Sequence, residues 1–231
     1  MMKPICIAYS SILKQVEFIE QKEWQHKWHQ DTIWYDVIYH DSLKLISKNE
    51  LRRAVNLAMT TWDLEVPVKY KPVWQSKGLT PDIVIEFKTR DEDQYLKDRP
   101  SVLAYAYLPG QGEYSGKVVF CADYIWDLKG KGIKGSDAIK KGIVENAHPT
   151  NILKTYNLNH VLIHELGHTL GLHHDSDRNS IDVMDPFYNG KILDLSERDI
   201  YRIRLKYGVR VFKHWSHYNI LKRWLKRRIR R

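Results

Sequence analysis

Residues 164–174 read HELGHTLGLHH, and this run constrains the chain more than any other. Because an α-helix turns once every 3.6 residues, His164 and His168 lie on the same face of a helix and can share one metal ion. Gly171 can adopt a positive φ and turn the chain, so that His174 returns as a third ligand. Three protein ligands leave one coordination position open, as in catalytic zinc sites. The run therefore predicts one catalytic Zn²⁺.

Glu165 lies beside the position left for a water molecule, where a carboxylate can act as general base. The alternative interpretation is an amphipathic helix with solvated histidines, which requires three histidines, a glutamate and a glycine to coincide by chance. His173 is the rival third ligand, but the spacing selects His174. We expect the other histidines to be solvated or locally hydrogen-bonded: His26, His29, His40, His148, His214 and His217.

The composition limits the classes of protein to which the chain can belong. Its 231 residues are 43% hydrophobic, enough for one domain with a sizeable core. Cys6 and Cys121 form neither a CxxC pair nor a disulfide framework, so zinc has to be held by histidine. We find no secretory signal and no apolar run that could span a membrane. The default expectation is a cytoplasmic monomer, with non-classical export or packaging into a particle left open.

The pattern of the chain predicts a mixture of helices and strands. We expect helices over 10–30, from the Ser47–Glu50 capping box onward, over 157–171, and from Ser196 to Gly208. Strands are expected at 33–39, 66–74, 82–87, 102–108 and 117–120. The Gly- and Lys-rich residues 128–150 predict a surface excursion, which either shapes a substrate cleft or is an idle loop.

The net charge of +9 comes from residues 209–231, which carry nine Lys or Arg and no acidic residue. Trp215, Tyr218, Leu221 and Leu225 recur at steps of three or four, which predicts a basic amphipathic helix. Such a helix suits an anionic partner, either a membrane surface, nucleic acid or an acidic protein. The alternative is a helix packed on its own domain with a solvated basic face.

Beyond the zinc motif, the chain resembles the metzincin peptidases, and most closely the catalytic domain of the matrixins. The resemblance is carried by HELGHTLGLHH, by VMDPFY at 183–188, by LSERDIYRIRLKYG at 195–208, and by the segments ELRRAVNLAMTTWDLEVPVKY, DIVIEF and VLAYAYLPGQG. It implies an α+β, zincin-like fold: a twisted mixed sheet of about five strands on two long helices, with a smaller C-terminal subdomain.

The resemblance divides the chain into three parts. Residues 1–30 form an N-terminal segment, and 31–208 form the catalytic domain, with the 128–150 insertion. Residues 209–231 form the basic tail. The C-terminal subdomain would contain a methionine turn and the closing helix.

The resemblance also implies roles for further residues. Met184 would form the apolar floor of a methionine turn beneath the zinc ligands, or else be an ordinary core methionine. Pro186 and Tyr188 would border the specificity pocket. His160 would line its base and make it shallow or polar, or else be a partly buried helix histidine. Substrate would add as a strand to an exposed sheet edge at 102–108, which contains Ala104 and Tyr105.

Several positions depart from the matrixin pattern. The histidines of the family's structural zinc are replaced by Tyr105 and Val119, so we expect no structural zinc. Of the calcium ligands only Asp123 is retained, which makes calcium unlikely. The sequence around Cys6 does not match the cysteine switch of matrixin pro-segments. Asp175 stands where matrixins usually have Ser.

The sequence thus predicts a zinc endopeptidase that hydrolyses protein or peptide substrates by metal-activated water, with Glu165 as general base. The alternative is a catalytically idle metzincin scaffold that acts as a binding or structural module, while its basic tail engages nucleic acid, membrane or an acidic partner. A third hypothesis makes the tail the main functional element and the peptidase a processor of its partner. The complete set of three histidines with Glu165 favours the peptidase.

Overall fold

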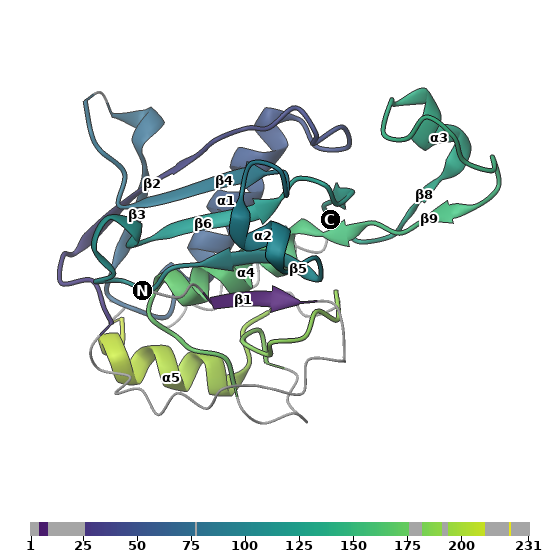
Figure 1. Ribbon diagram of the computed structural model, residues 1–231. Helices are drawn as coiled ribbons and strands as arrows, with labels where there is room; N and C mark the ends of the chain where they lie inside the picture. The colour runs from purple at the N-terminus through teal and green to yellow at the C-terminus, as the bar shows by residue number, and fades with distance from the viewer. Residues whose placement is uncertain are drawn as a thin grey trace.

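The computed structural model describes residues 5–8, 26–76, 78–175, 182–190, 194–210 and 222. Its centre is a mixed sheet in the order β1-β5-β6-β4-β2-β3 (Figure 1). The strands are β1 (Ile5–Ala8), β2 (Thr32–Val37), β3 (Lys69–Pro72), β4 (Ile83–Lys88), β5 (Val102–Ala106) and β6 (Lys117–Cys121). Only β5 and β1 are antiparallel to their neighbours. The five strands from β5 to β3 give the α+β mixed sheet that the sequence predicts.

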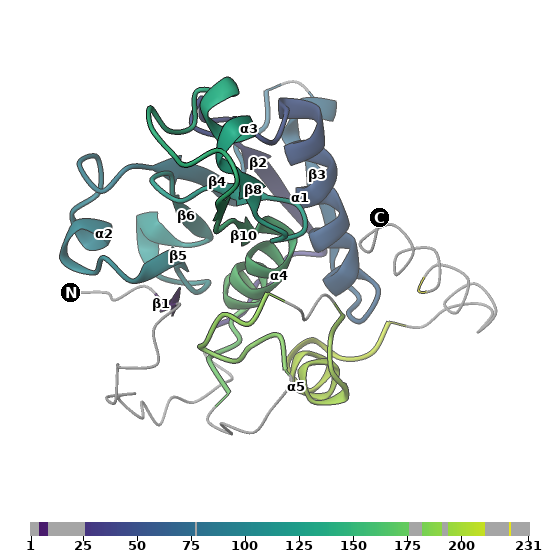
Figure 2. The ribbon, with the colours of Figure 1, turned by 90° about the vertical axis from the view of Figure 1, so that its right-hand side faces the viewer.

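Two long helices pack on this sheet. They are α1 (Lys48–Asp63) and α4 (Leu158–Thr169), which contact each other and the strands (Figure 2). The predicted capping box is present, because the Ser47 side chain accepts from the Glu50 N–H and Glu50 accepts from the Ser47 N–H. Alternating residues of β2 and β4 are buried in the core. Every residue of α4 is buried, so this helix lies inside the domain.

The two helices are also joined by a hydrogen bond. The Trp62 indole N–H of α1 donates to the Ile163 carbonyl oxygen of α4 at 2.9 Å. Trp62 itself is fully buried. A large aromatic side chain with a satisfied N–H fills the space between the helices. Its hydrogen bond also fixes the position of α4 along α1. Helix α4, which carries His164 and His168, is therefore held by α1.

The outer face of β5 and β6 carries a second, smaller apolar cluster. Its buried members are Leu96, Val102, Tyr105, Val119 and Cys121. Leu96 comes from the short helix α2 (Gln94–Asp98), which the sequence analysis did not predict. Burial on both faces explains why β5 and β6 read as continuous apolar runs and not as alternating ones.

The closing helix α5 (Glu197–Tyr207) begins and ends where the sequence predicts. Ser196 and Asp199 form its capping box, and Gly208 ends it with a φ of +82°. The predicted helix over 10–30 is wrong for 26–30, which is irregular, and residues 9–25 lie outside the described part of the chain. Trp28 of this stretch donates its indole N–H to the Thr169 carbonyl oxygen at 2.8 Å.

The insertion at 128–150 has structure that the sequence analysis did not predict. The strands β8 (Ile133–Lys134) and β9 (Ile152–Leu153) pair antiparallel and carry α3 (Gly135–Lys140) between them. At its base, β7 (Trp126–Asp127) pairs in parallel with β10 (Tyr156–Asn157). Figure 1 shows this insertion, which we call the arm (residues 128–153), projecting beyond the sheet. Single turns of 3₁₀-helix lie elsewhere at Val73–Gln75 and Gly112–Tyr114.

One expectation about the sheet is wrong. The resemblance implied an exposed edge at 102–108, but β1 pairs with β5 there, with Ile5 opposite Ala106 and Cys6 opposite Tyr105. The outermost strand on this side is therefore β1.

The predicted tail helix lies outside the described residues, apart from 209, 210 and 222. Arg210 donates to the Val66 and Val68 carbonyl oxygens at 2.8 and 2.7 Å, and it pairs with Asp63. Within the described residues, none of the helices has the length and apolar character needed to span a membrane.

The turn that follows α4 gives a test of the local packing. Gly171 has a φ of +85°, and a Cβ there would collide with the His26 carbonyl oxygen, which also accepts from Lys206. Gly208 has a similar φ and open space around it. We expect Gly208→Ala to cost about 1–3 kcal/mol from backbone strain, and Gly171→Ala to cost about 1–3 kcal/mol more from the added collision.

Urea unfolding of the two variants and the wild type measures this difference. Equal free energies of unfolding for the two variants would contradict the close contact between the turn and residue 26.

Candidate metal centre

Three imidazole rings converge at the end of α4. The Nε2 atoms of His164 and His168 are 3.0 Å apart, and those of His164 and His174 are 3.3 Å apart. The Nε2 atoms of His168 and His174 are 3.2 Å apart. A tetrahedral zinc ion bound by ring nitrogens at about 2.0–2.1 Å requires ligand atoms about 3.3–3.4 Å apart. The spacing of the three nitrogens therefore fits one zinc ion.

The opposite sides of two of these rings are held by the backbone. His164 Nδ1 lies 2.7 Å from the Val183 carbonyl oxygen, and His168 Nδ1 lies 2.7 Å from that of Leu172. A carbonyl oxygen can only accept, so each Nδ1 carries the proton and each Nε2 presents a lone pair. Lone pairs at such short separations repel unless a cation lies among them. Such backbone partners are the usual outer support of metal-binding histidines.

Burial keeps these imidazoles neutral. It lowers the pKa of His164 well below its ordinary value, and the neighbouring His174 ring lowers it further. The pKa of His168 is lowered by burial and then by the rings of His164 and His174. Neutral rings are the form that binds metal. In the described part of the chain, these three residues are the only group of three or more His, Cys, Asp or Glu side chains close enough to share an ion.

Met184 lies against α4 at Gly167. It is fully buried, and a Cβ added at Gly167 would collide with its Sδ and lie 2.9 Å from Trp62 Cζ2. The glycine inside the HELGH run is therefore required by close packing. Because the adjacent Val183 carbonyl receives the His164 N–H, the 183–184 turn supports both the helix and one ring.

Asp199 of α5 holds this turn in place. Its carboxylate accepts from the Val183 N–H at 2.9 Å, the Met184 N–H at 3.4 Å and the Ser196 N–H at 3.0 Å. Burial raises the pKa of Asp199, and the hydrogen bonds from Ser196 and Val183 oppose that rise. The sequence analysis saw Asp199 only as a capping residue, so its second role was missed.

Asp175, the residue after His174, forms a second connection to the 183–184 turn. The Asp175 N–H donates to the Met184 carbonyl oxygen at 2.9 Å, and its carboxylate pairs with Arg198 of α5 at 2.6 Å. Arg202 donates to the His173 carbonyl oxygen at 2.9 Å. The segment that carries His174 is thus tied both to the turn and to the closing helix. The sequence analysis noted Asp175 only as a departure from the matrixin pattern, so its pairing with Arg198 was missed.

Glu165 is fully buried on α4, directly after the first histidine. His173, the rival third ligand, is not a member of the converging group. The structure therefore brings together His164, His168 and His174 and places Glu165 next to them in the chain.

The residues predicted for a specificity pocket fall into two places. His160 is 1% exposed and its ring lies 5.2 Å from that of Tyr188. The Tyr188 hydroxyl accepts from the N–H of Asn157, the residue that caps α4. Pro186 is half-buried in the same loop. His160 and Tyr188 are therefore neighbours, one on α4 and the other on the loop after the methionine turn.

Ala104 and Tyr105 lie apart from this pair, on β5. Ala104 is buried in the main core. The Tyr105 hydroxyl donates to Asp93 at 2.6 Å within the second apolar cluster, so its side chain does not line the predicted pocket. Tyr105 is directly opposite Val119 in the sheet. Asp123, the retained acidic residue, pairs with Arg90 at 2.8 Å.

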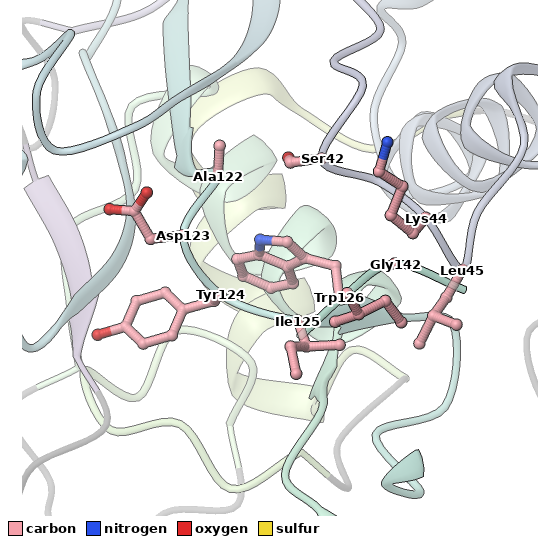
Figure 3. Close-up of a pocket in the computed structure, with 10 residues that line it drawn as sticks. Ser42, Lys44, Leu45, Ala122, Asp123, Tyr124, Ile125, Trp126 and Gly142 are labelled. Atoms are coloured by element: carbon pink, nitrogen blue, oxygen red, sulfur yellow. The ribbon is translucent and has the colours of Figure 1, made fainter. Parts of the chain in front are cut away.

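A cavity of about 310 Å³ lies elsewhere, between the chain around Ser42–Leu45, the 122–126 segment and the arm (Figure 3). The Trp126 indole forms part of its lining and donates to the Cys121 carbonyl oxygen at 2.8 Å. None of its lining residues is a predicted site residue. The chemistry of the molecule is therefore expected at the histidines and not in this cavity.

Comparison with known proteins agrees with this arrangement. The family model of the matrixins (Peptidase_M10) matches residues 27–208. Matrilysin of Felis catus is 35% identical over 80% of this chain, which covers 61% of that protein. Matrix metalloproteinase-25 of Homo sapiens is 29% identical over 78% of this chain, which covers 30% of that protein.

Matrix metalloproteinase-C of Caenorhabditis elegans is 34% identical over 77% of this chain, and the match covers 26% of that protein. The chain therefore spans between about a quarter and three fifths of these relatives. The family match begins at residue 27, just before β2, and ends at Gly208, the residue after α5. It includes the three converging histidines and the 183–184 turn. The chain belongs to the matrixin family.

Proposed function

We propose that this chain is a zinc-dependent endopeptidase. The observation that carries the proposal is the convergence of three Nε2 atoms at 3.0–3.3 Å on α4 and the turn after it. The matrixin relatives support it, because their printed names are those of metalloproteinases and matrilysins. His164, His168 and His174 would hold the zinc ion and leave a fourth position open.

When bound, zinc supplies Lewis acidity, which lowers the pKa of a water molecule and polarises a carbonyl oxygen. Glu165 would accept the proton from the attacking water and later deliver it to the leaving amine nitrogen. Its burial at 0% exposure keeps this proton transfer away from bulk solvent. The Val183 and Leu172 carbonyls keep two rings oriented throughout, since they hold the Nδ1 protons.

The substrate class follows from the same proposal. A protein or peptide in extended form would lie across the three histidines, with the side chain after the scissile bond directed toward His160 and Tyr188. Because these two rings are in edge-to-face contact at 5.2 Å, the pocket between them would be shallow. The anionic partner of the tail and the monomeric state stay predictions.

A matched pair of variants, at His174 and His173, tests which histidine is the third ligand. Adding zinc to the metal-free protein is expected to raise Tm by on the order of 10 °C, because an ion at about a thousand times its Kd stabilises the folded state by about 4 kcal/mol. His174→Ala should lose most of this rise, and His173→Ala should keep it. Thermal melts with zinc content per chain measure both. The reverse ranking would reassign the ligand to His173.

The role of Glu165 is tested by Glu165→Gln, which keeps the size of the side chain and removes the base. We expect kcat to fall by about 10²–10⁴-fold while zinc per chain stays at the wild-type value. Cleavage of casein and of a fluorogenic peptide library measures kcat. Equal activity of the two proteins would exclude Glu165 as the base. Absence of cleavage by the zinc-loaded wild type would favour the idle scaffold.

A further inference from the structure

The arm is the basic part of an otherwise slightly acidic domain. It carries five lysines against two acidic residues, whereas the rest of residues 1–208 carries 23 basic and 26 acidic residues. All five lysines are exposed, and within the described part of the chain none of them forms an ion pair. Cations that no acid of the same chain neutralises attract an anionic partner. The five are Lys129, Lys131, Lys134, Lys140 and Lys141.

The arm stands on the helix that carries two of the histidines (Figure 2). The Asn159 side-chain amide of α4 donates to the Leu128 carbonyl oxygen at 2.9 Å. A Cβ added at Gly130 would lie 3.1 Å from the Cβ of Asn157, which caps α4, and 3.2 Å from the Tyr188 hydroxyl oxygen. The base of the arm is therefore packed against both the start of α4 and the ring that borders the proposed pocket.

One carboxylate holds the backbone of two of the lysines at this base. Asp127 accepts from the Lys129 N–H at 2.6 Å and from the Lys131 N–H at 3.3 Å. It also accepts from the Gly130 N–H between them. The Thr155 hydroxyl, on the returning side of the arm, donates to the same carboxylate at 2.7 Å. Lys129 and Lys131 thus have a fixed place on either side of the glycine that meets the pocket.

The arm lies in the direction in which the proposed substrate would continue. Along α4, His164, His160 and Asn157 follow one another at steps of about one turn, toward the arm. The proposed function directs the side chain after the scissile bond toward His160 and Tyr188, and Gly130 lies against Tyr188. An extended chain advances about 3.3 Å per residue, so the third to fifth residues after the scissile bond lie roughly 7–13 Å past the first. These residues would pass the base of the arm.

We infer that the arm selects substrates with an acidic segment after the scissile bond. Lys129 and Lys131 bind the first acidic side chains, and the three lysines farther along the arm attract the rest of the segment. This inference rests on the proposed function, because it takes the direction of the substrate from it. An exposed ion pair stabilises little by itself, so two such pairs together change kcat/KM about fivefold, and salt weakens the effect.

Three fluorogenic peptides test the inference with the zinc-loaded full chain. They share the sequence through the second residue after the scissile bond, and their next three residues are all Glu, all Gln or all Lys. At about 0.01 M salt we expect kcat/KM to be about fivefold higher for the Glu peptide than for the Gln peptide, through KM, and lowest for the Lys peptide. At about 1 M salt the difference should vanish. Equal kcat/KM for the three peptides at low salt would overturn the inference, and the proposed function would stand.

A matched pair of double variants assigns the preference to the arm. Lys129→Gln/Lys131→Gln keeps the backbone N–H groups that Asp127 holds, so it should abolish the preference for Glu and leave kcat/KM for the Gln peptide at the wild-type value. The control is Lys69→Gln/Lys71→Gln, which removes two exposed lysines at the same spacing on β3, at the opposite edge of the sheet. The control should keep the preference. An equal loss in both double variants would attribute the preference to net charge and overturn the inference.

A binding measurement separates this inference from the activity. Labelled Glu and Gln peptides are bound to zinc-loaded Glu165→Gln, which removes the proposed base, and fluorescence anisotropy gives their Kd values. The Glu peptide should bind about fivefold more tightly, and adding Lys129→Gln/Lys131→Gln should remove the difference. If this holds but the wild type cleaves no peptide, the proposed function fails and the inference stands. Equal Kd values would overturn the inference, and so would a single-stranded oligonucleotide that binds the arm more tightly than the Glu peptide does.

Discussion

Two hydrogen bonds from imidazole N–H groups to backbone carbonyls determine what this molecule can do. They fix which nitrogen of His164 and of His168 carries the proton, and they leave the other nitrogens as lone pairs 3.0 Å apart. An arrangement of neutral, buried acceptors at that distance is unfavourable without a cation. The rest of the domain can be described by how it holds those two carbonyls in place.

The Leu172 carbonyl belongs to the turn that begins at Gly171, and the Val183 carbonyl belongs to the methionine turn. The first turn is packed against the His26 backbone, and the second is held by Asp199. Segments far apart in the chain thus meet around one helix that is buried on every side. The match to the matrixins extends over these same segments, from residue 27 to residue 208.

Sequence reasoning succeeded where the signal is local. The Ser47 and Ser196 capping boxes, the five central strands and α4 follow from spacing within a few residues. It failed where the decisive partner is distant. The helix expected over 10–30 is irregular at 26–30, because Trp28 is hydrogen-bonded to Thr169 at the C-terminal end of α4.

In the candidate site, too, features with a local sequence signal were predicted and features that depend on distant partners were not. The converging histidines were predictable from the turn of a helix and one glycine. The brace by Asp199 and the pair between Asp175 and Arg198 were not, because no local pattern indicates which carboxylate meets which turn. Tyr105 was assigned to a pocket by resemblance, whereas its hydroxyl is held by Asp93 on the other face of the sheet. A strand position alone does not tell which face a neighbouring helix will cover.

The hold of Asp199 on the methionine turn has a consequence for biosynthesis. Translation delivers the three histidines before it delivers residue 199, so the nascent chain has its ligands but lacks the carboxylate that positions the Val183 carbonyl. A metal ion captured at that moment would meet rings free to rotate. If the histidines hold an ion as proposed, their final orientation requires that α5 has emerged from the ribosome and docked.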